Sequence, residues 1–180
     1  MCYDKSKWIY EHDSSKNVRY VLGTKGEKTL FCIGVNPSTA TPYILDNTVK
    51  RVEKIAVNNE YSNWIMLNIY PEISTDPNGL PYSPAQEIHN LNIKHIKKIL
   101  NNYHDITIWV AWGNSIDNRS FLKNYLLDIY ETIKNEKVVN YVAGVVNKTG
   151  NPRHPLFTKG DIALTQFDME VFIKKNVYKQ

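Results

Sequence analysis

Runs of almost uninterrupted apolar residues constrain this chain more than any other feature of its sequence. Residues Asn63–Ile69 include four consecutive apolar side chains, and Ile106–Ala111 is a second run of the same kind. A strand with one face in water alternates apolar and polar residues, whereas a continuously apolar strand is covered on both faces. The two runs therefore predict strands of a parallel sheet that carries helices on both sides.

Segments with helical spacing separate the predicted strands. Asn47 or Thr48 can cap the first of these helices. The motif Ser83-Pro84-Ala85-Gln86 offers an N-cap Ser, a Pro in the first turn and a capping-box Gln, so we expect the second helix to begin there. Apolar residues recur three or four positions apart in three segments, 49–56, 88–100 and 121–133, as one buried helix face requires.

Further runs complete the expected architecture. Asn17–Leu22 and Lys28–Val35 are joined by a turn that two glycines bracket, which predicts an antiparallel hairpin at the start of the sheet. Val138–Val142 is predicted as another core strand, and Asp161–Lys175 as the closing helix. The element order predicts a single α/β domain over residues 1–180, with three layers around a mainly parallel central sheet.

Composition excludes several classes of protein. A chain of 180 residues with 42% hydrophobic residues can bury one core, and a net charge of +4 is far below that of a dedicated nucleic-acid-binding tail. Two distant cysteines, Cys2 and Cys32, exclude a disulfide scaffold. No apolar run reaches the roughly 18–20 residues of a membrane span, and the charged start of the chain is not a signal peptide. We therefore expect a cytoplasmic protein without membrane contact.

The carboxyl ends of the predicted strands indicate where a ligand would bind, because loops diverge there and helix N-termini point into the crevice. Each of four segments carries a polar group beside a Gly or Pro, and none carries an acidic residue. Carboxamides and one imidazole suit a heterocycle, since an amide presents a donor and an acceptor side by side, as a nucleobase edge does. Metal-ligand spacing is absent, and no cofactor is expected. The four segments are 36–40, 68–71, 112–114 and 153–156.

These segments resemble motifs of a known superfamily. Residues 34–38 (GVNPS) resemble the G-x-N-P-G first motif of mismatch-type uracil-DNA glycosylases, and residues 64–68 (WIMLN) resemble the strand that ends in the base-reading Asn. Residues 108–113 are similar to the superfamily's apolar strand closing on Gly, and 154–156 (HPL) to its H-P-S second motif. The order agrees for all four, so the resemblance implies a uracil-DNA glycosylase-like fold.

A closer resemblance is to a family of bacterial and phage proteins known as domain of unknown function 1643. It rests on residues 34–40, the motif Asp46-Asn47-Thr48, residues 68–71 and residues 152–156. This nearer family brings no activity with it. The wider resemblance alone implies an enzyme that cleaves an N-glycosidic bond in DNA or a nucleotide.

The wider resemblance assigns roles to three residues. Asn36 would position or polarise the attacking water, Asn68 would read the base edge, and His154 would stabilise negative charge on the departing base. The chain departs from the motifs at Ser38, where they have Gly, and after Pro155, where they have Ser. Asp46 would be a substitute acid or base, or else a helix-start residue.

Each candidate also has a structural interpretation. Asn36 before Pro37 can cap a turn, Asn68 can bind the loop, and Tyr43 and Tyr70 can pack rather than stack on a base. The other histidines, His12, His89, His95 and His104, are expected at the surface. The full set of candidate contacts is Asn36, Pro37, Ser38, Thr39, Tyr43, Asp46, Asn47, Asn68, Tyr70, Trp112, Gly113, Asn114, Arg153 and His154.

Two functions remain open at this stage. The first is a glycosylase-like N-glycosidase that acts on a base in DNA or in a nucleotide. The second is a binding module that holds a nucleotide or nucleotide-derived small molecule without cleaving it. Fold class does not separate them, and the sequence does not give the base or the oligomeric state.

Overall fold

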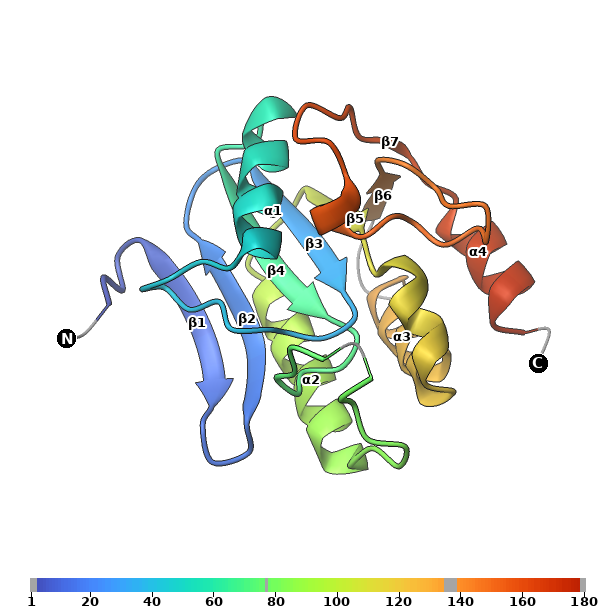
Figure 1. The fold of residues 1–180 in the computed structure, drawn as a ribbon. Helices are drawn as coiled ribbons and strands as arrows, with labels where there is room; N and C mark the ends of the chain where they lie inside the picture. Colours follow the sequence, from blue (N-terminus) through green and yellow to red (C-terminus); the bar gives the residue numbers. More distant parts are fainter. Residues whose placement is uncertain (1–2, 77, 135–138, 179–180) are drawn as a thin grey trace.

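A seven-stranded sheet forms the centre of the computed structural model, which describes residues 3–76, 78–134 and 139–178 (Figure 1). The strand order is β1-β2-β4-β3-β5-β6-β7. The strands are β1 (Trp8–Asp13), β2 (Val18–Thr24), β3 (Thr29–Gly34), β4 (Asn63–Asn68), β5 (Ile106–Val110), β6 (Val139–Ala143) and β7 (Thr165–Gln166). The helices are α1 (Asn47–Asn58), α2 (Gln86–Leu100), α3 (Phe121–Lys134) and α4 (Met169–Asn176), with short 3-10 helices η1 (Gly113–Asn118) and η2 (Pro155–Phe157).

The predicted α/β class is confirmed, with parallel pairing confined to the middle of the sheet. Strands β4, β3, β5 and β6 run parallel, whereas β1, β2 and β7 at the edges pair antiparallel. Apolar residues of α1 pack on one face of the sheet, and those of α2, α3 and α4 pack on the other. The result is three layers, as the doubly apolar strands require.

The predicted hairpin between Asn17–Leu22 and Lys28–Val35 is wrong. Strand β4 lies between β2 and β3, antiparallel to β2 and parallel to β3. Gly23 permits the close approach of β4, since a Cβ at this position would lie 2.5 Å from the carbonyl oxygen of Trp64. The chain does begin with a hairpin, but β1 and β2 form it, because a strand as apolar as β3 is covered by neighbours at both edges.

Two predicted helix starts also differ. The segment Asp161–Lys175 is helical only from Met169, because Asp168 caps the helix by accepting from Val171 N–H, and β7 precedes it. Helix α2 begins at Gln86 without a side-chain cap, so Ser83 is not its N-cap. The predicted strand Val138–Val142 is β6, with Val138 outside the described residues.

The described helices contain no segment long and apolar enough to cross a membrane.

Candidate functional site

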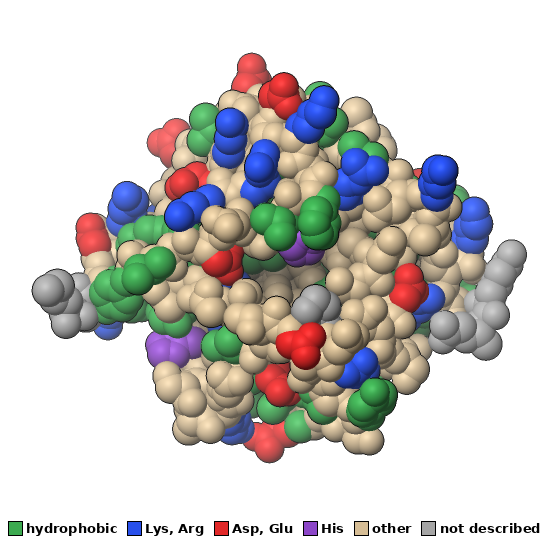
Figure 2. Space-filling view, viewed as in Figure 1, with side chains coloured by type: hydrophobic (Ala, Val, Ile, Leu, Met, Phe, Trp, Pro, Cys, Tyr) green, Lys and Arg blue, Asp and Glu red, His purple; other side chains and the backbone are tan. Residues whose placement is uncertain are grey.

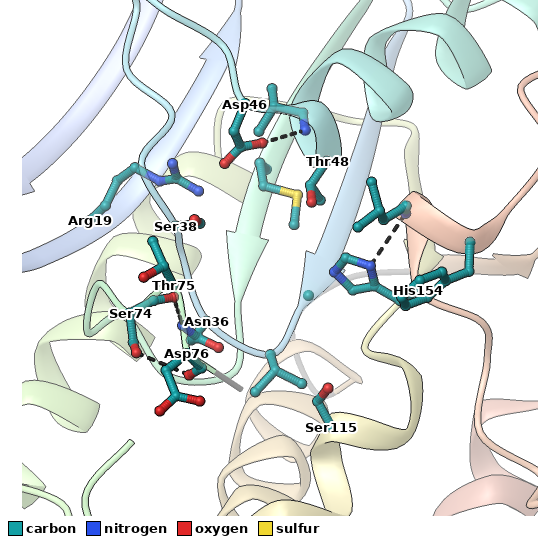
Figure 3. Close-up of a pocket in the computed structure, with 16 residues that line it drawn as sticks. Arg19, Asn36, Ser38, Asp46, Thr48, Ser74, Thr75, Asp76, Ser115 and His154 are labelled. Carbon is teal, nitrogen blue, oxygen red and sulfur yellow. Dashed lines mark hydrogen bonds between the residues drawn. The ribbon is translucent and has the colours of Figure 1, made fainter. Parts of the chain in front are cut away.

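A pocket of about 280 Å³ opens at the carboxyl end of β3 (Figures 2 and 3). The strand order explains its place: from β3 the chain passes through α1 to β4 on one side, and then through α2 to β5 on the other side. Such a reversal separates the loops above the sheet and leaves a crevice. The lining side chains come from β2 and β4, from the end of β3, from the segments that follow β4, β5 and β6, and from the start of α1.

Asn36 lines this pocket immediately after β3. Its Nδ2 donates to the carbonyl oxygens of Pro37 and Ser74, both at 3.0 Å. The turn-capping interpretation therefore holds for the amide nitrogen of Asn36. Asn36 Oδ1 accepts none of the hydrogen bonds found within the described residues. Because the bonds made by Nδ2 hold the amide in place, Oδ1 is an acceptor with a fixed orientation.

His154 lines the pocket from the loop after β6. Its Nδ1 accepts from Leu156 N–H at 3.3 Å and so caps η2. Burial lowers the pKa of His154, and the negative charge of Asp46 opposes that shift only in part. A neutral imidazole with Nδ1 as acceptor carries its proton on Nε2. His154 thus offers an N–H donor from its other edge.

The helix-start interpretation of Asp46 is confirmed, and its role as an acid or base stays a prediction. Asp46 is the N-cap of α1, where Oδ1 accepts from Val49 N–H at 2.8 Å, so neither Asn47 nor Thr48 is the cap. Asp46 and Thr48 also line the pocket. The carboxylate therefore stabilises the helix start and places negative charge beside the ligand space (Figure 3).

Arg19 is a pocket residue that the sequence analysis missed. It lies on β2 and is only 2% exposed, and its Nη1 donates to the carbonyl of Ala40 at 2.7 Å. Its Nε has no partner among the described residues. Burial lowers the pKa of Arg19 to about 10, against the opposing effect of Asp46, so the guanidinium stays charged at neutral pH. The signal in the sequence was a single cation inside an apolar strand, which is rare without a partner.

The loop after β4 supplies further contacts that were missed. Ser74, Thr75 and Asp76 line the pocket, as does Ser115 on η1. The rule that ligands bind beyond the carboxyl ends of strands selected residues 68–71. The same rule would have selected residues 74–76 if the segment after β4 had been extended by a few residues.

Apolar groups form the remaining wall. Val35, Val49 and Met66 lie deep, whereas Leu156 and Phe157 stand at the rim and are 43% and 73% exposed. Figure 2 shows hydrophobic side chains beside a histidine at the edge of the hollow. A flat ring entering between these groups would meet apolar surface on its faces.

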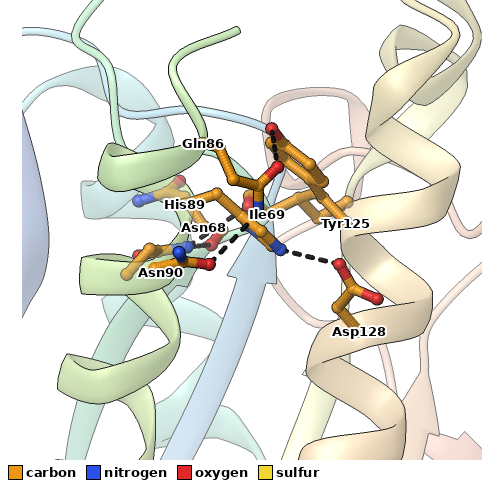
Figure 4. A network of polar contacts seen from close by, with 8 residues as sticks. Asn68, Ile69, Gln86, His89, Asn90, Tyr125 and Asp128 are labelled. Atoms are coloured by element: carbon orange, nitrogen blue, oxygen red, sulfur yellow. Dashed lines mark hydrogen bonds and ion pairs between the residues drawn. The ribbon is translucent and has the colours of Figure 1, made fainter.

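Asn68 does not line the pocket, and it is fully buried at the end of β4. In the amide orientation that satisfies its polar atoms, it donates to the backbone carbonyls of Asn36 and Leu67, both at 3.3 Å. Asn92 of α2 donates to the carbonyls of Asn68 and Ile69, two residues that Figure 4 labels. Asn68 thus supports the loop that carries Asn36, as the structural interpretation allowed.

Next to Asn68 the structure buries His89, which was expected at the surface. That prediction is wrong: His89 is 0% exposed, its Nε2 lies 2.9 Å from Asp128 Oδ2, and its ring stacks on Tyr125 at 3.5 Å. His95 is half-buried and stacks on Tyr20, while His12 and His104 are exposed. Helical periodicity placed His89 on α2 but did not show that α3 covers it.

Two aromatic candidates lie in the core rather than in the pocket. Tyr70 is buried with its ring 5.3 Å from that of Phe121, and burial raises its pKa to about 12. Trp112 packs 5.2 Å from Phe172. Neither lines the pocket, so their contribution is to packing beneath it.

Ser38 lines the pocket as predicted, whereas the remaining candidates do not. Asn114 Oδ1 accepts from Asn147, Thr149 and Asn151, and Arg153 Nε donates to Asn147 at 3.2 Å. These bonds fix the loop that ends at His154. The other candidates that do not line the pocket are Gly113, which lies behind His154, Pro37, which is buried, Thr39 and Tyr43, which are exposed, and Asn47, which lines a neighbouring groove.

Within the described parts of the chain, no three His, Cys, Asp or Glu side chains are grouped to hold a metal ion.

Comparisons with known proteins give one match. Residues 19–156 match the family described as protein of unknown function (DUF1643). No curated protein and no solved structure shows significant similarity to the chain. The matched region contains all of the pocket residues named above except Phe157. Because the match covers more than half of its length, the chain belongs to the DUF1643 family.

Proposed function

We propose that this protein recognises a nucleobase within a nucleotide or nucleotide-derived molecule, and that the pocket at the end of β3 holds the base. The observation that carries the proposal is Arg19, a buried cation that lines the pocket and whose guanidinium makes one hydrogen bond, from Nη1, among those found within the described residues. Figure 3 shows its guanidinium turned toward the centre of the pocket. Burying a cation with unused donors is costly, and a ligand carbonyl or ring nitrogen would offset that cost.

The polar groups of the pocket match a base edge. Asn36 Oδ1 offers an acceptor, while His154 Nε2 and the Arg19 guanidinium offer donors, and each is oriented by bonds to the protein. Uracil, thymine and guanine present both carbonyl oxygens and ring N–H groups. We therefore expect a base with a carbonyl group to bind better than adenine.

Size and charge support the same ligand class. A volume of about 280 Å³ is at the lower end of small-molecule pockets. The charged groups that line it are one cation, Arg19, and two carboxylates, Asp46 and Asp76. Such a pocket gathers no positive charge, which favours a neutral heterocycle over an anion.

Cleavage of the N-glycosidic bond is a second candidate function, and the motif resemblance to uracil-DNA glycosylases supports it. One observation favours it: the Asp46 carboxylate lines the same pocket as Asn36 and His154. In this reaction, water oxygen bonds to the anomeric carbon while the carbon–nitrogen bond breaks, and the base leaves with the electron pair. Asp46 would accept the water proton, and His154 would donate a hydrogen bond to the anionic base.

The binding proposal is tested by calorimetric titration of uridine, thymidine, guanosine and adenosine nucleotides against wild type, Arg19→Met and Arg19→Lys. We expect Arg19→Met to weaken binding about 10–100-fold, since a hydrogen bond to a charged group is worth about 1.5–3 kcal/mol. Arg19→Lys keeps the positive charge but loses the planar guanidinium, so its affinity for the nucleotide should lie between that of wild type and that of Arg19→Met. Failure of every nucleotide to bind wild type at millimolar concentration would overturn the proposal.

Cleavage is tested by chromatography of free base after incubation with nucleotides and with uracil-containing oligonucleotides. If the protein is a glycosidase, His154→Asn should release base about 10²–10³-fold more slowly, because Asn can still cap η2 but lacks the Nε2 donor. The exposed His104→Asn is the matched control and should act as wild type. Tight binding with no base release would assign the protein to the binding-module class.

A further inference from the structure

A groove lined by basic side chains lies beside the pocket, and Leu156 borders both cavities. We call it the basic groove. Figure 2 shows Lys and Arg side chains gathered over α1, next to the hollow. The groove has a volume of about 370 Å³ and is lined by Asn47, Lys50, Arg51, Lys54 and Leu156.

Within the part of the chain that the structure describes, the cations of the basic groove form no ion pair with an acidic side chain. None of the ion pairs found among the described residues includes Lys50, Arg51 or Lys54. Lys50 and Lys54 are four positions apart on α1, so their like charges destabilise the helix. Three uncompensated cations in one groove produce a local positive potential that attracts anions.

The groove is shaped by the loop that follows η2. Asn58 of α1 donates to the carbonyl of Gly160 at 2.7 Å, which holds this loop against the helix. A Cβ at Gly160 would lie 2.8 Å from Lys54 Cδ and Cε and 3.2 Å from Arg51 Nη1. The glycine therefore lets the two basic side chains lie against the loop, so part of their freedom is already lost before an anion binds.

Resting on the proposed function, we propose that the basic groove binds the phosphate attached to the sugar of the ligand whose base enters the pocket. The charge distribution separates the two parts of that ligand: the pocket contains one cation and two carboxylates, and the groove contains three cations. Leu156 stands between them, where the sugar would lie. The substrate class is then a nucleoside phosphate rather than a nucleoside or a free base.

The test compares wild type with Lys50→Gln/Lys54→Gln, a double variant at exposed positions. The probes are 2′-deoxyuridine, its 5′-monophosphate, its 5′-diphosphate, and a single-stranded oligonucleotide of eight residues with one central deoxyuridine. A second double variant, Lys94→Gln/Lys175→Gln, changes two exposed lysines on α2 and α4 and removes the same net charge. Dissociation constants are measured by titration at about 50 and 200 mM salt.

We expect wild type to bind the monophosphate at least about tenfold more tightly than the nucleoside, an advantage equivalent to about 1.4 kcal/mol. Lys50→Gln/Lys54→Gln should lose this advantage and its salt dependence, and should keep the affinity for the nucleoside. Lys94→Gln/Lys175→Gln should behave as wild type. Whether the free nucleotide or the oligonucleotide binds more tightly identifies the source of the phosphate.

Two results separate failure of this inference from failure of the proposed function. Equal affinity for nucleoside and monophosphate, with Arg19→Met weakening both, would overturn the phosphate site and leave the base pocket intact. Phosphate-dependent binding that Lys50→Gln/Lys54→Gln weakens but Arg19→Met does not would support the groove and overturn the base pocket.

Discussion

A single glycine fixes the position of the candidate donor His154. Gly113 has a φ of +64°, in the left-handed region that L side chains rarely adopt. A Cβ at this position would lie 2.9 Å from His154 Cβ, and Gly113 N–H donates to the carbonyl of Pro152 at 2.9 Å. The loop end that carries the imidazole therefore packs directly on a backbone without a side chain.

Gly113→Ala should consequently lower stability and impair ligand binding together. The left-handed conformation costs a non-glycine residue about 1–2 kcal/mol, and the new methyl group must displace His154. Gly150→Ala is the matched control, because Gly150 also has a positive φ, of +87°, but a Cβ there would meet no atom within 4 Å. Thermal unfolding and nucleotide titration should show both variants destabilised and only Gly113→Ala weakened in binding. Equal affinities would show that the position of His154 is unimportant.

At the scale of the element, the start of α1 serves both fold and site. Its N-cap Asp46 satisfies a backbone N–H that would otherwise lack a partner. The same first turn brings Thr48 and Val49 to the pocket, and the following turns bring the cations of the basic groove. Any change that frays this end of the helix therefore disturbs both cavities.

Substitutions of Asp46 should separate its two roles. Asp46→Ala removes the cap and should reduce the free energy of unfolding by about 1 kcal/mol, whereas Asn is as good an N-cap as Asp, so Asp46→Asn should keep most of it. Urea unfolding measures the difference. If Asp46 also acts on the ligand through its charge, Asp46→Asn should change nucleotide binding or base release despite its near-normal stability. Unchanged ligand behaviour in Asp46→Asn would restrict Asp46 to the helix.

At the scale of the whole molecule, a buried histidine joins α2 to α3 behind the sheet. His89 contacts Asp128 and stacks on Tyr125, while its Nδ1 has no partner among the described residues. Burial lowers the pKa of His89, and Asp128 opposes the shift only in part. The unfolded chain therefore takes up this proton more readily than the folded chain.

Stability should fall on acidification for this reason. The free energy of unfolding keeps its full value above the ordinary histidine pKa of about 6.5. It decreases as the pH falls below that value toward the lower pKa of the folded state. His89→Gln should flatten the dependence between about pH 7.5 and 5.5, and exposed His104→Gln should not. Urea unfolding at several pH values measures the slope, and an unchanged slope in His89→Gln would contradict the assignment. Burial lowers the pKa of His154 as well, so part of the slope should remain in His89→Gln.

Local pattern was enough to predict the α/β class, most helices and the end of the sheet where the pocket lies. Continuous apolar runs identified β4 and β5, because a strand that is buried on both faces has apolar side chains at successive positions. The strand-end rule selected Asn36 and His154 from opposite ends of the chain, and both line one pocket. These features depend on residue type and spacing, which the chain carries before it folds.

Only the tertiary structure decided which strands are neighbours and which side chains are covered. Insertion of β4 between β2 and β3 depends on contacts among segments far apart in the chain, and no turn motif encodes it. The same long-range packing turned Asn68 under the pocket, buried His89 beneath α3, and brought Arg19 of β2 beside Asp46. The sequence of each segment determines which of its residues can be buried. Which other segment covers those residues depends on the free energy of the whole core.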